Sequence, residues 1–131
     1  MFVDASALVA IVTREPGWEA LAQRAGKAKV RLTSPIAVYE AAMAIARKSG
    51  LAADSACTEL LSFLAAAGIE AVDVTPGNGA EAVKAFQRFG KGRHRAALNM
   101  GDCFSYACAK AHGAPLLFKG GDFELTDIAK A

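Results

Sequence analysis

The feature that most constrains the fold is an alternation of short apolar strands with pairs of helical segments. Between consecutive strands the sequence has room for two helices with apolar stripes, which gives the order β-α-α-β-α-α-β-α-α-β. Parallel strands joined by right-handed helical crossovers form a sheet with helices on both faces. We therefore expect an α/β fold with a central parallel sheet of about four to five strands. The expected strands are Phe2–Val3, Lys29–Thr33, Ile69–Val74 and Pro115–Phe118.

The composition predicts one globular domain that spans residues 1–131. Hydrophobic residues make up 53% of the chain, which is enough to fill a single core. The mean hydropathy is positive, yet no uninterrupted apolar run reaches the length of a membrane span and no basic-then-apolar leader opens the chain. We therefore expect a soluble, cytoplasmic protein.

The three cysteines indicate neither a disulfide framework nor a zinc site. Cys57, Cys103 and Cys108 are odd in number and lack Cys-x-x-Cys spacing. We expect all three to be small buried hydrophobic side chains.

Charge is distributed unevenly along the chain. The formal net charge is only +2, from 15 Lys and Arg against 13 Asp and Glu. No acid lies between Glu81 and Asp102, however, and the charge pattern leaves two interpretations open: a solvated helix face and loop, or a strip that binds phosphates. The basic residues and the histidine of this interval are Lys84, Arg88, Lys91, Arg93, His94 and Arg95.

Three aspartates are expected at the same edge of the sheet. Asp4 and Asp122 follow the first and last strands, and Asp102 lies in the first turn of an apolar helix. In open parallel sheets, sites form beyond the carboxyl ends of the strands. Each residue also has a local interpretation, because Asp4 can cap the next helix and Asp102, after a cap at Asn99 or Gly101, favours the positive helix end.

A fourth acid, Glu40, lies on the apolar stripe of the helix that Ser34-Pro35 begins. It shares this stripe with Ile36 and Ala44, so it either leans over the sheet edge or lies at the rim of the stripe and reaches water. Four carboxylates in one place repel one another, which favours a hard divalent cation such as Mg²⁺ or Mn²⁺. Ser6 can hydrogen-bond to the Asp4 carboxylate or to a ligated water.

Two further expectations concern helices and partners. Thr75–Gly79 is expected to be a turn without the spacing of a nucleotide-binding loop, followed by a helix from Ala80 to about Phe89. Val83 and Phe86, with Phe89 as a further candidate, are expected to face the core.

The first two helices and the helix around Leu60 carry an apolar surface, part of which could seat a partner segment or a second copy of the chain. The residues of this surface are Leu8, Ile11, Trp18, Leu21, Leu60 and Leu64.

Several motifs occur together in a fixed order. They are Val-Asp-Ala-Ser-Ala-Leu at 3–8, Glu40, Gly-Lys-Gly-Arg-His at 90–94, Leu-Asn-Met-Gly-Asp-Cys-Phe at 98–104 and Leu-Leu-Phe-Lys-Gly-Gly-Asp-Phe at 116–123. Together they resemble PIN-domain proteins, specifically VapC-type toxins of bacterial toxin–antitoxin pairs. One position departs from the resemblance, because Gly121 stands where the family has the first of two tandem acids.

The resemblance implies a metal-dependent endoribonuclease with Mg²⁺ or Mn²⁺ as cofactor, a homodimer that a cognate antitoxin inhibits. Asp4 and Asp102 would be metal ligands, directly or through water, and Glu40 a ligand or the residue that orients the attacking water. Asp122 would be a fourth, less direct member. The residues expected to contact the RNA substrate are Ser6, Lys91, Arg93, Arg95 and Lys119.

Three alternatives remain at this stage. A PIN-like domain that has lost activity would be an RNA-binding or partner-binding module, and Gly121 favours this. A metal-free ribonuclease would use His94 and His112, the only histidines. A phosphatase with Asp4 as nucleophile would need an acid two residues later, where this chain has Ser6.

Overall fold

The computed structural model describes residues 1–131 and confirms the expected order of strands and helices. The first strand has the predicted bounds, the other three are shorter than predicted, and a 3-10 turn follows the last one. In chain order the elements are β1 (Phe2–Val3), α1 (Ala5–Val12), α2 (Trp18–Lys27), β2 (Arg31–Thr33), α3 (Pro35–Ser49), α4 (Ala53–Ala67), β3 (Ile69–Ala71), α5 (Pro76–Phe89), α6 (Met100–Ala111), β4 (Leu116–Leu117) and η1 (Asp122–Leu125).

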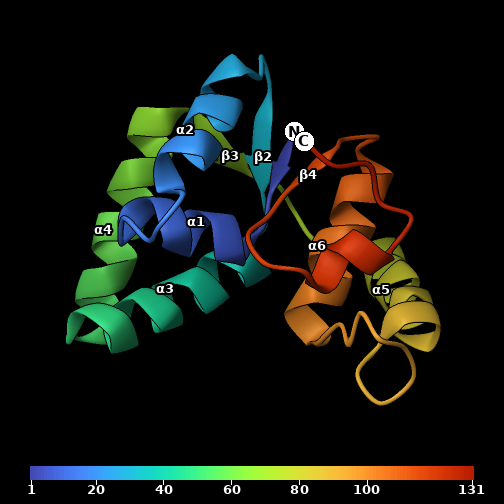
Figure 1. Cartoon of the computed structure of the whole chain (residues 1–131). Helices are drawn as coiled ribbons and strands as arrows, with labels where there is room; N and C mark the ends of the chain where they lie inside the picture. The colour runs from blue at the N-terminus through green and yellow to red at the C-terminus, as the bar shows by residue number, and fades with distance from the viewer.

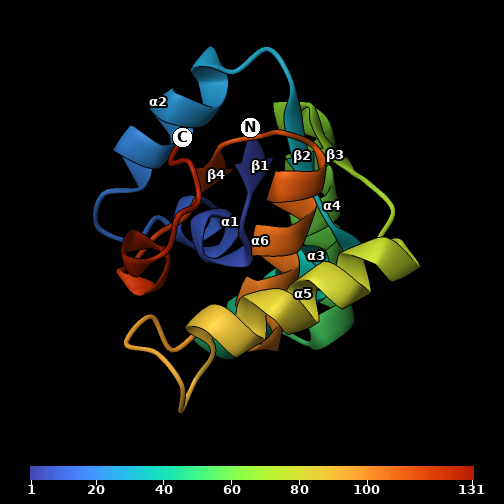
Figure 2. The same cartoon turned by 90° about the vertical axis from the view of Figure 1, so that its right-hand side faces the viewer.

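The sheet has four parallel strands in the order β3-β2-β1-β4. Helices α1 to α4 lie against one face, while α5 and α6 lie against the other (Figures 1 and 2). Beyond β4, the chain end runs back alongside the strand, because Leu116 donates to the Ala129 carbonyl and accepts from the Ala131 N–H. The expected α/β fold is therefore confirmed, with β1 in the interior of the sheet.

The two faces of the sheet are filled by alternate residues of the strands. Phe2 and Leu116 belong to the core under α5 and α6, whereas Val3 and Leu117 belong to the core under α1 to α4. This is the two-residue alternation of a strand. All four side chains are fully buried, so even two-residue strands are anchored on both faces.

The start of α5 differs from the expected turn at Thr75–Gly79. Thr75 caps the helix, and its hydroxyl and the Asn78 side chain hydrogen-bond to each other's backbone N–H groups. Pro76 occupies the first helical position, where its missing N–H costs nothing and its fixed φ angle suits the helix. The helix therefore begins four residues before the predicted Ala80.

The predicted buried face of α5 is wrong for Val83 and Phe86 and is confirmed for Phe89. Val83 and Phe86 are 69% and 39% exposed, whereas Ala82, Ala85 and Phe89 are buried. Helices α5 and α6 make the most extensive contact between any two elements, and small side chains at the interface let two helices approach closely. The exposed residues leave an open apolar groove, lined by Gly79, Ala82, Val83, Phe86, Met100, Cys103 and Phe104.

Other expectations about burial are largely confirmed. Cys103 and Cys108 are buried, Cys57 is partly buried, and all three are free thiols. No single helix is long and apolar enough to cross a bilayer; α3 and α4 pass such a test only together, as a pair bent by 118°.

Core packing on α4 gives a first prediction. Leu60 is fully buried while its neighbour Leu61 is 50% exposed. Leu60→Ala should lower the free energy of unfolding by about 2–5 kcal/mol, because it leaves a cavity. Leu61→Ala, a matched control on the same helix, should change it by less than about 0.5 kcal/mol. Urea unfolding of both variants measures the difference, and equal losses would contradict the packing described here.

Candidate functional site

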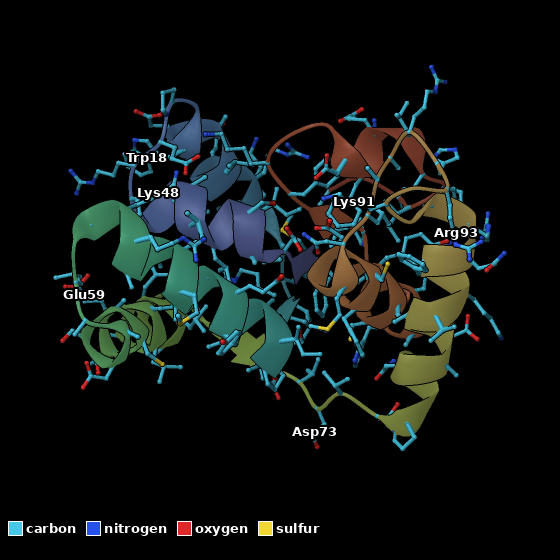
Figure 3. The ribbon with its side chains drawn as sticks, turned by 90° about the horizontal axis from the view of Figure 1, so that it is seen from below. Trp18, Lys48, Glu59, Asp73, Lys91 and Arg93 are labelled. Carbon is cyan, nitrogen blue, oxygen red and sulfur yellow. The ribbon has the colours of Figure 1, made fainter.

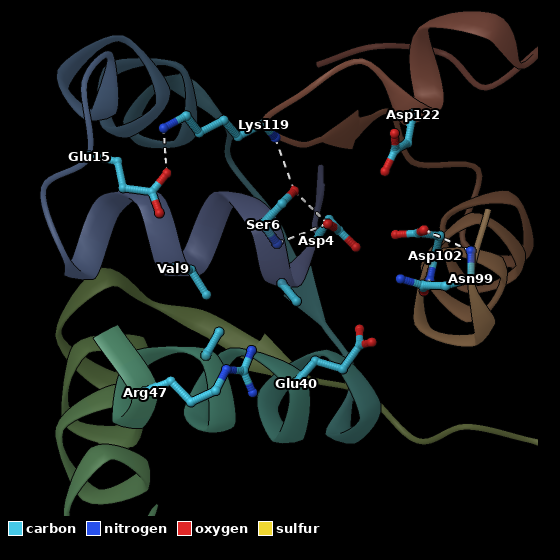
Figure 4. Close-up of a pocket in the computed structure, with 12 residues that line it drawn as sticks. Asp4, Ser6, Val9, Glu15, Glu40, Arg47, Asn99, Asp102, Lys119 and Asp122 are labelled. Carbon is cyan, nitrogen blue, oxygen red and sulfur yellow. Dashed lines mark hydrogen bonds and ion pairs between the residues drawn. The ribbon is translucent and has the colours of Figure 1, made fainter. Parts of the chain in front are cut away.

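The four acids predicted from the sequence line one pocket of about 350 Å³. Figure 4 shows them arriving from four separate segments: the end of β1, the middle of α3, the first turn of α6 and the segment after β4. Ser6, Asn99 and Lys119 line the same pocket. The edge of the sheet therefore gathers residues that lie far apart in the sequence, namely Asp4, Glu40, Asp102 and Asp122.

Asp4 is almost completely buried, with 2% of its surface exposed. One carboxylate oxygen, Oδ2, accepts hydrogen bonds from the Ser6 N–H at 2.9 Å and from the Ser6 hydroxyl at 2.6 Å. The other oxygen, Oδ1, is buried without a hydrogen-bond partner. Asp4 therefore caps α1 with one oxygen and keeps the other without a partner, so the capping interpretation is confirmed and is compatible with a role in the pocket.

Ser6 connects Asp4 to the segment that follows the neighbouring strand β4. Its hydroxyl donates to Asp4 and accepts the backbone N–H of Lys119 at 3.0 Å. The segment after β4 is thereby tied to the start of α1. The expected hydrogen bond between Ser6 and the Asp4 carboxylate is confirmed.

Asp102 is held at the start of α6 by a reciprocal pair of hydrogen bonds with Asn99. The Asn99 side chain accepts from the Asp102 N–H, and Asp102 accepts from the Asn99 N–H, both at 2.9 Å. Asn99 is therefore the helix cap, one of the two residues that the sequence offered. The interaction fixes the orientation of the Asp102 carboxylate at the pocket wall.

The pKa of Asp102 is raised from 3.8 to about 7, first by burial and then by the charges of Asp4, Asp122 and Glu40, while the Asn99 N–H opposes the shift. The pKa of Glu40 is also raised, by burial and by the charge of Asp4. These carboxyl groups disfavour one another's ionisation. The pocket is therefore electrostatically suited to a cation.

Gly101 makes room for Glu40. A β-carbon built at Gly101 would lie 1.9 Å from Glu40 Oε2, far inside any allowed contact. Gly101 is buried and helical, so it is needed for space rather than for backbone conformation. From the sequence, Gly101 was expected only as a possible cap of this helix.

Asp122 lies in the pocket wall although the preceding acid of the family pattern is missing. It is the first residue of η1 and adds to the charge that Asp102 experiences. A β-carbon at Gly121 would meet nothing within 4 Å, and its φ angle of −103° is open to any residue. Neither packing nor backbone conformation therefore explains why glycine stands at position 121.

The donor set of the pocket fits a hard divalent cation. It consists of carboxylate oxygens, which Mg²⁺ and Mn²⁺ prefer, and includes the unpartnered Oδ1 of Asp4. No group of three or more His, Cys, Asp or Glu side chains lies close enough to ligate one ion together. Ligation partly through water, or after a side-chain rotation, suits this spacing.

The predicted RNA contacts are divided between the pocket and a separate loop. Lys119 lines the pocket, where it is paired with Glu15. Lys91, Arg93 and Arg95 are exposed on the loop between α5 and α6 and do not line it. Arg93 lies over the ring of Phe86, and Figure 3 shows Arg93 beside α5.

Two charged residues of the pocket were not predicted from the sequence. Glu15 is one of them, and its position in the pocket depends on the fold. Arg47 also lines the pocket. It lies two helical turns after Glu40, so the stripe that identified Glu40 could have indicated Arg47 as well.

The histidines are outside the pocket. His94 accepts the Ala96 N–H at Nδ1 and lies edge-on to Phe89. His112 is exposed at the end of α6. A metal-free reaction on two histidines therefore finds no support in this arrangement.

Comparison with known proteins identifies relatives along the whole chain. The PIN domain family profile matches residues 1–129. A protein named Ribonuclease VapC from Mycolicibacterium smegmatis is 46% identical over 129 residues, covering 98% of each chain. Ribonuclease VapC30 of Mycobacterium tuberculosis is 43% identical, covering 98% of this chain and 96% of its own.

A solved structure supports the fold independently. The crystal structure of Mycobacterium tuberculosis VapC20, described as a Sarcin-Ricin loop cleaving toxin, aligns with a TM-score of 0.79 at 20% identity. The alignment covers 99% of this chain and 97% of that structure.

The contact between Gly101 and Glu40 gives a second prediction. Gly101→Ala should keep or raise the free energy of unfolding, because alanine favours helix by about 1 kcal/mol over glycine and the Glu40 carboxylate can rotate away. The displaced carboxylate should then titrate with a pKa closer to its ordinary value of 4.5. Carboxyl NMR titration of Glu40 measures this change.

A matched control is Gly26→Ala on α2, where a β-carbon meets nothing within 4 Å. This variant should gain helix stability without altering the pKa of Glu40. An unchanged Glu40 pKa in Gly101→Ala would contradict the prediction, because the carboxylate would then keep its position beside the added methyl group.

The raised pKa of Asp102 gives a third prediction, for the metal-free protein. Between 3.8 and about 7, the folded chain binds more protons than the unfolded chain, so stability should fall as pH rises through this window. Asp102→Asn keeps a hydrogen-bond acceptor for the Asn99 N–H but removes the charge, so it should lose less stability over the same range.

The measurement is urea unfolding with EDTA at about pH 5 and about pH 8. An equal pH dependence of the wild type and Asp102→Asn would contradict the raised pKa of Asp102.

Proposed function

We propose, from the premise that this chain belongs to the PIN-domain family and within it to the VapC ribonucleases, that it cuts RNA at the pocket of the four acids. RNA cleavage is the activity for which these relatives are named, and the chain is accordingly an endoribonuclease and the toxin of a toxin–antitoxin pair. The single observation that carries the assignment of residues is that Asp4, Glu40, Asp102 and Asp122 line one pocket.

We further propose Mg²⁺ or Mn²⁺ as the cofactor, with Asp4 and Asp102 as the residues that hold it. A bound ion supplies an acidified water for in-line attack on a phosphodiester and neutralises charge on the departing oxygen. The Asp4 oxygen without a hydrogen-bond partner supports this assignment, as does the elevated pKa of Asp102.

The chain's own residues do the remaining work. Glu40 accepts a proton from the attacking water at its carboxylate, a role that its raised pKa favours. Ser6 keeps Asp4 in place, and Asn99 orients Asp102. Lys91, Arg93 and Arg95 hold the RNA backbone on the neighbouring loop, through contacts that weaken with salt.

The second candidate is a PIN-like domain that binds RNA or a partner without cutting. Gly121 favours it, because this position lacks the family's acid. Against it stands Asp122, which lines the pocket and whose charge acts on Asp102.

We propose that a VapB-like antitoxin inhibits the chain in the cytoplasm. Most of the surface expected to seat it is core, since Leu8, Ile11 and Leu60 are buried. A groove between α2 and α4 stays open, with a volume of about 190 Å³, and its lining includes Ala22 and Phe63. Copurification of a small protein encoded beside the native gene tests this partner.

We also propose a homodimer through the apolar groove of α5 and α6. Met100 is 66% exposed there, beside Val83 and Phe86, and the groove has a volume of about 280 Å³. Large exposed apolar groups that gather in one place are typical of protein interfaces. Sedimentation of the purified chain tests this, and a monomer at all concentrations would contradict it.

The fourth prediction concerns cleavage itself. Purified, antitoxin-free protein should cut a structured RNA pool in Mg²⁺ or Mn²⁺, and EDTA should stop the reaction. Asp4→Asn and Asp102→Asn should each lower the rate at least about 100-fold, because each removes a ligand charge. The products should carry 5′-phosphate and 3′-hydroxyl ends.

Cyclic phosphate products would contradict the metal route. RNA binding without cleavage in every metal would instead favour the non-catalytic candidate, with Gly121 as the disabling change.

A further inference from the structure

Arg47 is the one cation in the pocket wall that has no acidic partner. Lys119, the other, pairs with Glu15, which also pairs with Lys48 at the end of α3. The pKa of Glu15 is lowered by both lysines, chiefly through their hydrogen bonds. Glu15 thus neutralises much of the positive charge on its side of the pocket, whereas none of the ion pairs in the structure includes Arg47.

The position of Arg47 follows from the helix that also carries Glu40. Arg47 lies seven positions after Glu40 on α3, which places their backbones about 10 Å apart on the same face. Helical side chains lean toward the N-terminus, so Arg47 extends back toward Glu40. Figure 4 shows its guanidinium group between Val9 and Glu40, turned into the pocket.

Glu40 does not neutralise this guanidinium group. Its carboxylate is directed instead to the first turn of α6, where it occupies the space above Gly101. The pocket consequently has two electrostatic ends. Carboxylates gather beside α6, and an exposed, unpaired guanidinium group lies along α3.

A guanidinium group of this kind suits a phosphate. Its planar fork donates two parallel hydrogen bonds to phosphate oxygens and keeps its charge at every relevant pH. When one RNA phosphate lies at the acids, the next phosphate lies one nucleotide further along the RNA. Along α3, that next phosphate meets the positive charge of Arg47.

We propose that Arg47 binds the RNA phosphate adjacent to the one that is cut, and so sets how the strand lies across the four acids. This inference rests on the proposed ribonuclease function. It adds a substrate contact inside the pocket, separate from the basic loop that holds Lys91, Arg93 and Arg95.

The test compares Arg47→Ala and Arg47→Lys with Arg24→Ala, an exposed arginine in the last turn of α2 that does not line the pocket. Cleavage gives kcat and KM. Fluorescence anisotropy with a labelled single-stranded RNA of mixed sequence gives the dissociation constant in the Asp102→Asn background, at several salt concentrations. Thermal unfolding checks that each variant is folded.

Arg47→Ala should raise KM and the dissociation constant about tenfold, because a charge-assisted phosphate contact is lost. The slope of log affinity against log salt should become shallower by about 1. Arg47→Lys should recover part of the affinity, since lysine keeps the charge but loses the fork. Arg24→Ala should match the wild type.

Wild-type KM and salt slope in Arg47→Ala would overturn the proposal while leaving the ribonuclease function intact. A fall in kcat alone would also overturn it, because Arg47 would then act on the acids rather than on the RNA. If the wild type binds RNA but never cuts it, weaker binding by Arg47→Ala still supports the contact, and the proposed reaction fails. A chain that binds no RNA refutes both.

Discussion

The hydrogen bonds of the buried Asp4 carboxylate are the interaction on which the arrangement of the pocket depends. A charge with 2% of its surface exposed is costly unless it is satisfied. Ser6 satisfies one oxygen with two donors, and the Lys119 N–H completes the chain to β4. One short network therefore fixes the end of β1, the start of α1 and the exit of β4, which are three of the segments around the pocket.

At the start of α6, hydrogen bonds likewise stabilise the fold and position a carboxylate of the pocket. Asp102 and Asn99 satisfy each other's backbone N–H groups, so one structure both begins the helix and places a carboxylate in the pocket wall. A stabilising role at the helix start is therefore compatible with the role proposed for Asp102 in the site. Burial, and then the charges of the neighbouring acids, raise the pKa of Asp102 to about 7. The pocket is therefore electrostatically favourable for a cation.

The sequence was sufficient to predict what depends on local pattern. Apolar periodicity, caps and the geometry of parallel sheets predict the order of strands and helices along the chain and most helix starts. They also predict the convergence of four acids on one pocket, namely Asp4, Glu40, Asp102 and Asp122. The buried face of α5 could not be predicted in this way, because the helix buries the small side chains of Ala82 and Ala85 rather than larger ones. Which face is buried depends on how closely α6 packs against α5.

Other misses share this origin in tertiary contact. Gly101 matters because a carboxylate from another helix occupies the space beside it. Glu15 matters because two lysines distant in sequence meet it. Neither contact can be predicted from the sequence alone. The position of Arg47, in contrast, could have been predicted from the helical period of α3.

The last residues of the chain cover the outer edge of β4. β4 is the outer strand of the sheet, and its free side is paired with the returning segment at Ala129 and Ala131. An uncovered edge of this kind is a template for adding strands from other molecules. The same strand leads directly into Lys119 and Asp122. The pairing therefore limits association between molecules and also holds one wall of the pocket in place. An affinity tag joined to this end would start beside that edge.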